Sequence, residues 1–106
     1  MKHFLQNGYE VYSSISDNSE FDIIVSKDGI LKKVEIKSVN YIRGSSYEVQ
    51  LKSVRANKTS NKIRYFDSKR VDILAVFIEP ENKVVIYDAL EIKSKTTMRI
   101  LVSVIS

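Results

Sequence analysis

Three charged residues, Asp22, Glu35 and Lys37, have types and spacing that suit a joint chemical task. Glu35 and Lys37 lie two residues apart in a β-rich run, so their side chains project from the same face of a strand. Two carboxylates and an ammonium meeting at one point suit a divalent cation and chemistry on a phosphodiester. In such chemistry the cation polarises a phosphoryl oxygen, while the lysine orients a water or steadies developing charge.

A tight hairpin is predicted to bring these residues together. Asp28-Gly29 separates the β-rich runs 21–26 and 30–39, and this dipeptide suits a type I′ turn because both of its central residues need positive φ. With a two-residue loop, Asp22 stands opposite Glu35. Facing carboxylates are destabilising unless something compensates, and a bound cation would do so.

A plainer interpretation treats the same residues as the solvated outer face of a hairpin, with Lys37 paired to Glu35 or Asp22. The flanking residues favour the metal site. Phe21 to Val25 on one strand, and Val34 and Ile36 on the other, are apolar at most positions, which predicts central strands. Central strands rarely carry facing carboxylates without a compensating partner.

The composition narrows the choice of metal. The chain has no cysteine and a single histidine, His3, so a disulfide framework, a thiolate site and a cysteine nucleophile are excluded. Catalytic zinc usually takes two or three His or Cys ligands. Oxygen ligands therefore remain, and they suit Mg²⁺, with Mn²⁺ expected to substitute.

The remaining pattern predicts one α/β domain over residues 1–106, rich in strands and poor in helix. A short helix is expected to end at Gly8. A sheet with so few helices to cover it leaves room for a partner subunit. Strands are expected at 9–15, 47–54, 71–78, 83–87 and 98–105, with one helical turn in 88–93.

Positive charge is concentrated in one segment. Residues 52–70 hold seven basic residues and one acid, whereas the net charge of the whole chain is only +4. Such local basicity is typical of a surface that contacts a polyanion, although a solvated lysine-rich loop is the open alternative. Tyr65 is expected to pack in the core rather than to stack on a base. The candidate DNA contacts are Arg55, Lys58, Lys62, Arg64, Lys69 and Arg70.

The motif Asp22, twelve residues, then Glu35-Ile36-Lys37 resembles the signature of the PD-(D/E)XK nuclease superfamily. The order of the surrounding segments is similar to that of small homing endonucleases and archaeal Holliday-junction resolvases, over essentially the whole chain. The resemblance implies a restriction-endonuclease-like mixed β-sheet core with few, short helices. It also implies that Asp22, Glu35 and the Ile36 carbonyl bind metal and that Lys37 is the catalytic lysine.

Two features of the sequence depart from the family pattern. Phe21 stands where the signature has proline, which is common among members. The residues before Asn7 include no acid, although the first helix of many members supplies one; Glu10 and Glu20 are the nearest substitutes. Gln50 is a further polar residue that members often turn toward the site, although a strand glutamine is more often simply exposed.

The expected function is that of a Mg²⁺-dependent DNA endonuclease that acts as a homodimer or higher homo-oligomer, because one small site cuts one strand. The alternatives are a catalytically weak or inactive nuclease fold that only binds DNA, and an interaction domain that binds no metal. No apolar run approaches the roughly 20 residues that span a bilayer, so a cytoplasmic protein without membrane contact is expected.

Overall fold

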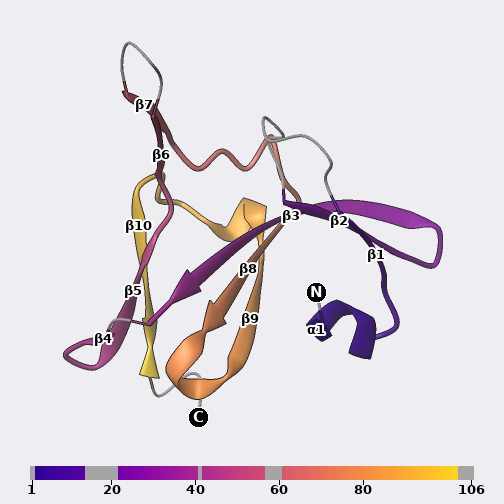
Figure 1. Ribbon diagram of the computed structural model, residues 1–106, viewed down its shortest axis with the longest axis horizontal. Coiled ribbons are helices and arrows are strands. Elements are labelled where there is room, and N and C mark those ends of the chain that lie inside the picture. Colours follow the sequence, from indigo (N-terminus) through magenta and orange to yellow (C-terminus); the bar gives the residue numbers. More distant parts are fainter. Residues whose placement is uncertain (1, 14–21, 41, 57–60, 103–106) are drawn as a thin grey trace.

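A computed structural model describes residues 2–13, 22–40, 42–56 and 61–102, with the side chains of 13, 43, 53–56, 61 and 62 left out (Figure 1). Its main feature is a five-stranded mixed sheet in the order β1-β2-β3-β8-β9. The strands of this sheet are β1 (Glu10–Ser13), β2 (Ile23–Lys27), β3 (Ile30–Val39), β8 (Ile73–Ile78) and β9 (Lys83–Asp88). This architecture confirms the predicted α/β class with a mixed sheet and little helix.

The β2–β3 hairpin has the predicted register. Lys27 pairs with Ile30, and the ladder continues to Ile23 opposite Val34. Asp28 and Gly29 have φ of 54° and 79°, as a type I′ turn requires. The local turn chemistry therefore sets which residues of the two strands face each other.

β3 lies between β2, which is antiparallel to it, and β8, which is parallel to it. A parallel pair needs a long crossover connection, commonly a helix. Here the crossover instead carries most of a second sheet, ordered β10-β5-β4, and a separate β6–β7 hairpin. These strands are β4 (Ile42–Arg43), β5 (Ser46–Gln50), β6 (Ser53–Ala56), β7 (Asn61–Arg64) and β10 (Thr97–Leu101), the last coming from the end of the chain.

The main sheet buries apolar residues on both faces. On one face, Leu74, Val76 and Ile78 of β8 pack with residues of the second sheet, including Tyr47 and Val49. On the opposite face, Ile73 and Ala75 pack with Val34 in the middle of β3 and with Phe4 of α1 (Lys2–Gln6). β8 is thus apolar almost throughout because both of its faces are covered, as expected for a central parallel strand.

The short helical elements are close to their predicted places. α1 is followed by Gly8 at φ 82°, the left-handed conformation that commonly ends a helix. A 3₁₀ turn, η1 (Glu79–Glu81), joins β8 to β9, and η2 (Ala89–Glu91) follows β9. Within the described part of the chain, no helix is long and apolar enough to cross a membrane.

Two expectations about the middle of the chain are wrong. The alternating segment 47–54 does not form one strand, because β5 ends at Gln50 and the backbone N–H groups of Leu51 and Lys52 both bond to the Thr96 carbonyl. β5 belongs to the second sheet, where its residues Tyr47 and Val49 are buried. Tyr65 is 49% exposed rather than packed in the core, whereas its neighbour Phe66 is buried.

Several predictions fall on residues outside the described ranges. These are the ends of the strands predicted at 9–15 and 98–105, together with Phe21, Glu20 and Lys58.

Candidate active site

The carboxylate of Asp22 lies against the backbone of β3. Asp22 directly precedes β2, and its backbone N–H donates to the Val34 carbonyl at 2.9 Å. Its side-chain Oδ2 accepts a hydrogen bond of 2.7 Å from the Ile36 N–H. The side chain therefore takes the place of the ladder bond that a continuing strand would supply at Ile36. This bond fixes one end of the carboxylate beside β3.

The same bond indicates where the Ile36 carbonyl points. In a strand, the N–H and C=O of one residue are directed to the same edge. Because the Ile36 N–H reaches Asp22, the Ile36 carbonyl is directed to the β2 side as well, next to the Asp22 carboxylate. The Ile36 side chain packs with the apolar cluster on the sheet face that Phe4 covers. Two kinds of oxygen ligand thus lie together where β2 begins.

Glu35 is half-buried on the opposite face of β3 from Ile36, and the pKa of its carboxyl is raised. Burial is the largest cause, and the negative charge of Asp22 raises the pKa further. The positive charges of Lys37, Arg64 and Arg70 act in the opposite direction. A half-buried carboxylate whose ionisation costs energy, close to a second carboxylate, favours a positively charged ligand.

Lys37 shares the sheet face of Glu35 and is half-buried. The two residues pair with Leu74 and Val76 of β8, which hold this part of β3 in the middle of the sheet. Because the charge of Lys37 acts on Glu35, the fold brings all three residues of the predicted motif, Asp22, Glu35 and Lys37, into one electrostatic group.

Asp72 has a structural role at the start of β8. Its Oδ2 accepts a hydrogen bond of 2.9 Å from the Lys33 N–H, and its own N–H donates to the Lys33 carbonyl at 2.9 Å. Its carbonyl accepts from the Ala89 N–H at 3.0 Å. Asp72 therefore fixes the start of β8 against β3, on the side of β3 opposite Asp22.

A third acidic ligand is not found in the described part of the chain, where no group of three or more His, Cys, Asp or Glu side chains could hold a metal. α1 contributes no acid, and Glu10 accepts a hydrogen bond from the Tyr12 hydroxyl at 2.6 Å on β1, the outermost strand next to β2. Glu20 lies outside the described residues. The candidate oxygen ligands among the described residues are thus two carboxylates and one carbonyl, a set that could hold Mg²⁺ because this ion usually keeps several waters.

A small hollow beside Glu35 is lined by the end of the basic segment. Arg64, Tyr65, Asp67, Arg70 and Val71 form it together with Glu35. The crossover from β3 to β8 explains this contact, because it carries the basic segment back over the face that bears Glu35. Glu35 and these residues are far apart in the sequence, so the sequence alone did not predict their contact.

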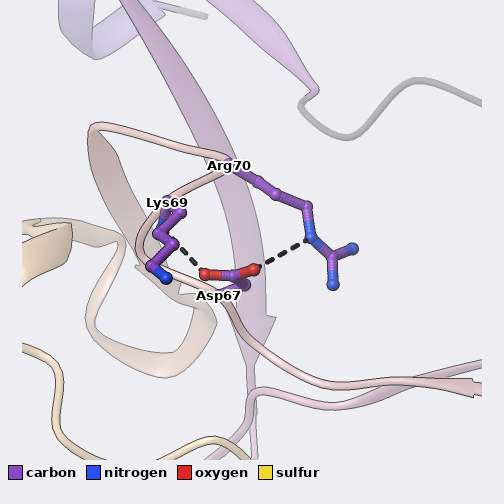
Figure 2. A network of polar contacts seen from close by, with 3 residues as sticks. All are labelled: Asp67, Lys69 and Arg70. Atoms are coloured by element: carbon purple, nitrogen blue, oxygen red, sulfur yellow. Dashed lines mark hydrogen bonds and ion pairs between the residues drawn. The ribbon is translucent and has the colours of Figure 1, made fainter.

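Asp67 organises the turn that presents Arg70. Its Oδ1 accepts a hydrogen bond of 2.9 Å from the Lys69 N–H, and its Oδ2 lies 3.5 Å from Arg70 Nε. Figure 2 shows the Lys69 and Arg70 side chains leaving on opposite sides of this carboxylate. The Lys69 N–H bond is the largest cause of the lowered pKa of Asp67, so the residue stays ionised and holds the turn.

The predicted DNA contacts separate into groups. Arg64 and Arg70 lie beside Glu35, whereas Lys69 lines a larger neighbouring pocket. Arg55 and Lys62 face each other across the β6–β7 hairpin, but their side chains, like the whole of Lys58, are outside the described residues. Gln50 is exposed in the second sheet, where it pairs with Thr97.

Lys93 and Lys95 were not predicted from the sequence to belong to the basic surface. The fold places them on the wall of the same pocket as Lys69, although more than twenty residues separate them in the chain. They lie beyond the dense basic segment, so the charge pattern gave no reason to group them with it.

Comparison with known proteins agrees with this geometry. A family model described as PD-(D/E)XK endonuclease matches residues 1–104. Protein 5.3 of Escherichia phage T7 is 32% identical over 95 residues, which are 90% of this chain and 75% of that protein. The solved structure of a bacterial homing endonuclease, I-Ssp6803I, superposes with a TM-score of 0.78 at 19% identity and covers 94% of this chain and 69% of the other.

Proposed function

The chain belongs to the PD-(D/E)XK endonuclease family, and from that premise we propose that it is a Mg²⁺-dependent endonuclease that hydrolyses phosphodiester bonds in DNA. The proposal is supported by the hydrogen bond from the Ile36 N–H to the Asp22 carboxylate and by the electrostatic coupling of Glu35 to Asp22 and Lys37. Mn²⁺ is expected to substitute for Mg²⁺, because both ions take oxygen ligands.

In this proposal Asp22, Glu35 and the Ile36 carbonyl hold the cation. When bound, Mg²⁺ supplies Lewis-acid polarisation of the scissile phosphate and lowers the pKa of a water. Asp22 is positioned for this task because its Oδ2 is fixed by the Ile36 N–H, while the rest of the carboxylate remains available. Glu35 gains a counter-charge for a carboxylate that is costly to ionise alone.

Lys37 has the catalytic task. Its ammonium donates hydrogen bonds to the attacking water or to a phosphoryl oxygen, and so stabilises negative charge as it develops. Arg64 and Arg70, which line the hollow beside Glu35, would contact the phosphates that flank the reacting one. Each of the six predicted basic contacts contributes to affinity without reading sequence.

A single such site cuts one strand. Cleavage of both strands therefore requires two copies, and we propose a homodimer or higher homo-oligomer for that reaction. The alternative within the same family is a nuclease fold that binds DNA with little or no cleavage. The two described carboxylates, without a third in the described ranges, are the observation in its favour.

The direct test is cleavage of supercoiled and branched DNA in Mg²⁺ or Mn²⁺ by the wild-type protein and Lys37→Ala. We expect nicking or cutting by the wild type and a loss of about 10²- to 10³-fold in rate for the variant, as when one preorganised donor to developing charge is removed. Equal cleavage by both proteins would overturn the mechanism. DNA binding without cleavage by the wild type would favour the alternative.

A further inference from the structure

A basic pocket lies next to the candidate active site and extends beyond the residues that line the hollow at Glu35. It has a volume of about 400 Å³. Its lining comes from two segments, 65–70 and 92–95, and includes four cationic side chains: Lys69, Arg70, Lys93 and Lys95. This volume is near the low end of the roughly 300–1,000 Å³ of pockets that enclose a small organic ligand.

The two segments that form the pocket are joined by specific contacts. The Phe66 N–H donates to the Lys95 carbonyl at 3.1 Å, and the buried Phe66 ring supports the floor. The Ser94 hydroxyl accepts from the N–H groups of Thr96 and Thr97 at 3.4 and 3.3 Å, which shapes the turn between Lys93 and Lys95. Lys93 and Lys95 therefore lie on a segment whose backbone is hydrogen-bonded to the basic segment.

The only carboxylate in the pocket lining is already engaged. Asp67 accepts from the Lys69 N–H and pairs with Arg70, as Figure 2 shows. Its charge is thus largely offset within the turn, and the pocket as a whole remains positive. A ligand that fits this pocket is an anion.

The pocket shares part of its lining with the hollow at Glu35. Tyr65, Asp67 and Arg70 line both of them, and Tyr65 is 49% exposed. An exposed aromatic ring beside cationic side chains is the combination that proteins use to hold single-stranded nucleic acid, with the base stacked and the phosphate paired.

We propose that this pocket binds one unpaired nucleotide of the cleaved strand, adjacent to the scissile phosphate. Its phosphate is held by Lys69, Lys93 and Lys95, and its base stacks on Tyr65. A duplex is far larger than the pocket, so the favoured substrate is DNA with a single-stranded segment or branch beside the cut. This inference rests on the proposed endonuclease function, which supplies the strand that leads into the pocket.

The test measures binding in a chelator, so that neither cleavage nor metal binding contributes. Fluorescence anisotropy compares a blunt duplex with the same duplex carrying a short single-stranded extension. The variant combines Lys93→Ala with Lys95→Ala. Its matched control combines Lys2→Ala with Lys32→Ala, two exposed lysines outside the pocket lining that remove the same charge.

We expect the wild type and the control to bind the extended probe several-fold more tightly than the blunt one, and the pocket variant to lose that preference. On the extended probe, the slope of log K against log salt should fall by about 0.7 to 0.9 for each lysine removed. Tyr65→Ala should lower the preference, and Tyr65→Phe should retain it because the ring remains.

A pocket variant that behaves like the control, or one that weakens both probes equally, would overturn the inference. Either result leaves the proposed function intact if the wild type cuts DNA and Lys37→Ala does not. Conversely, lost preference in the pocket variant together with no cleavage by the wild type would support the pocket and overturn the endonuclease proposal.

Discussion

The Oδ2 atom of Asp22 accepts a 2.7 Å hydrogen bond from the backbone N–H of Ile36, across the point where the ladder between β2 and β3 ends. This bond positions the carboxylate and leaves the Ile36 carbonyl directed to the same side. On the other side of β3, Asp72 makes an equivalent bond to the Lys33 N–H at 2.9 Å. Glu35 lies between these two points, so two aspartates fix the strand that carries it.

The hydrogen bond that Asp72 accepts from the Lys33 N–H should stabilise the fold and should not affect metal binding. Asp72→Ala removes the acceptor of the Lys33 N–H and is expected to lower the free energy of unfolding by about 1 kcal/mol. Denaturant unfolding in a chelator measures this change. Asp72→Asn, which keeps an acceptor oxygen, should lose less. If Asp72→Ala abolished metal binding while the protein remained folded, the structural role assigned to Asp72 would be wrong.

Glu35→Gln should stabilise the metal-free protein at neutral pH. Burial raises the folded-state pKa of Glu35 above its unfolded value of roughly 4.3. The stability that Glu35 contributes is thus fully present below the unfolded pKa and is lost as pH rises through the folded pKa. Glutamine cannot ionise and avoids that loss.

Thermal unfolding of both proteins in a chelator, across a pH series, checks this sign. The melting temperature of Glu35→Gln should exceed that of the wild type at neutral pH, and the difference should shrink toward zero below about pH 4. A difference that stays constant across the series would show that ionisation of Glu35 is not its cause.

The positive charge of Arg70 should lower the pKa of the Glu35 carboxyl. Because Arg70 lowers the pKa of Glu35, Arg70→Ala is expected to raise that pKa, so that Mn²⁺ binding begins at a higher pH than in the wild type. Mn²⁺ affinity measured against pH reports the shift. Lys69→Ala is the matched control, since Lys69 is not among the charges that act on Glu35. Equal pH profiles for Arg70→Ala and the wild type would contradict the coupling.

The left-handed backbone of the Asp28-Gly29 turn should contribute to the stability of the protein. Gly29 has φ of 79°, where a side chain costs roughly 1–2 kcal/mol. Among the described residues, none apart from Gly29 and its chain neighbours has a heavy atom within 4 Å of the place that a Cβ at Gly29 would take, so Gly29→Val should destabilise the protein through the backbone. Denaturant unfolding measures the loss. An unchanged free energy of unfolding would mean that the turn does not need the left-handed conformation.

Local chemistry explains what the sequence could predict. The hairpin register followed from two turn residues, and with it the approach of Asp22 to Glu35. The alternating residues of 47–54 predicted a strand, but they could not assign it to the second sheet, because alternation does not say which strand pairs with which.

The end of β5 and the exposure of Tyr65 depend on contacts between distant segments. The N–H groups of Leu51 and Lys52 donate to the Thr96 carbonyl, so the regular pairing of β5 ends before them. The Phe66 N–H likewise donates to the Lys95 carbonyl. The pocket that joins Lys93 and Lys95 to Lys69 arises from the same contacts. None of these pairings has a local signal in the sequence.

The central claim, that Asp22 and Glu35 together hold a divalent cation, is tested most directly by calorimetric titration with Mn²⁺. Asp22→Asn is the sharpest variant, because its amide oxygen can still accept from the Ile36 N–H while the charge is lost. The account predicts binding by the wild type and by Asp72→Asn, and none by Asp22→Asn or Glu35→Gln. Binding that survives in both Asp22→Asn and Glu35→Gln, or is absent from the wild type, would contradict it.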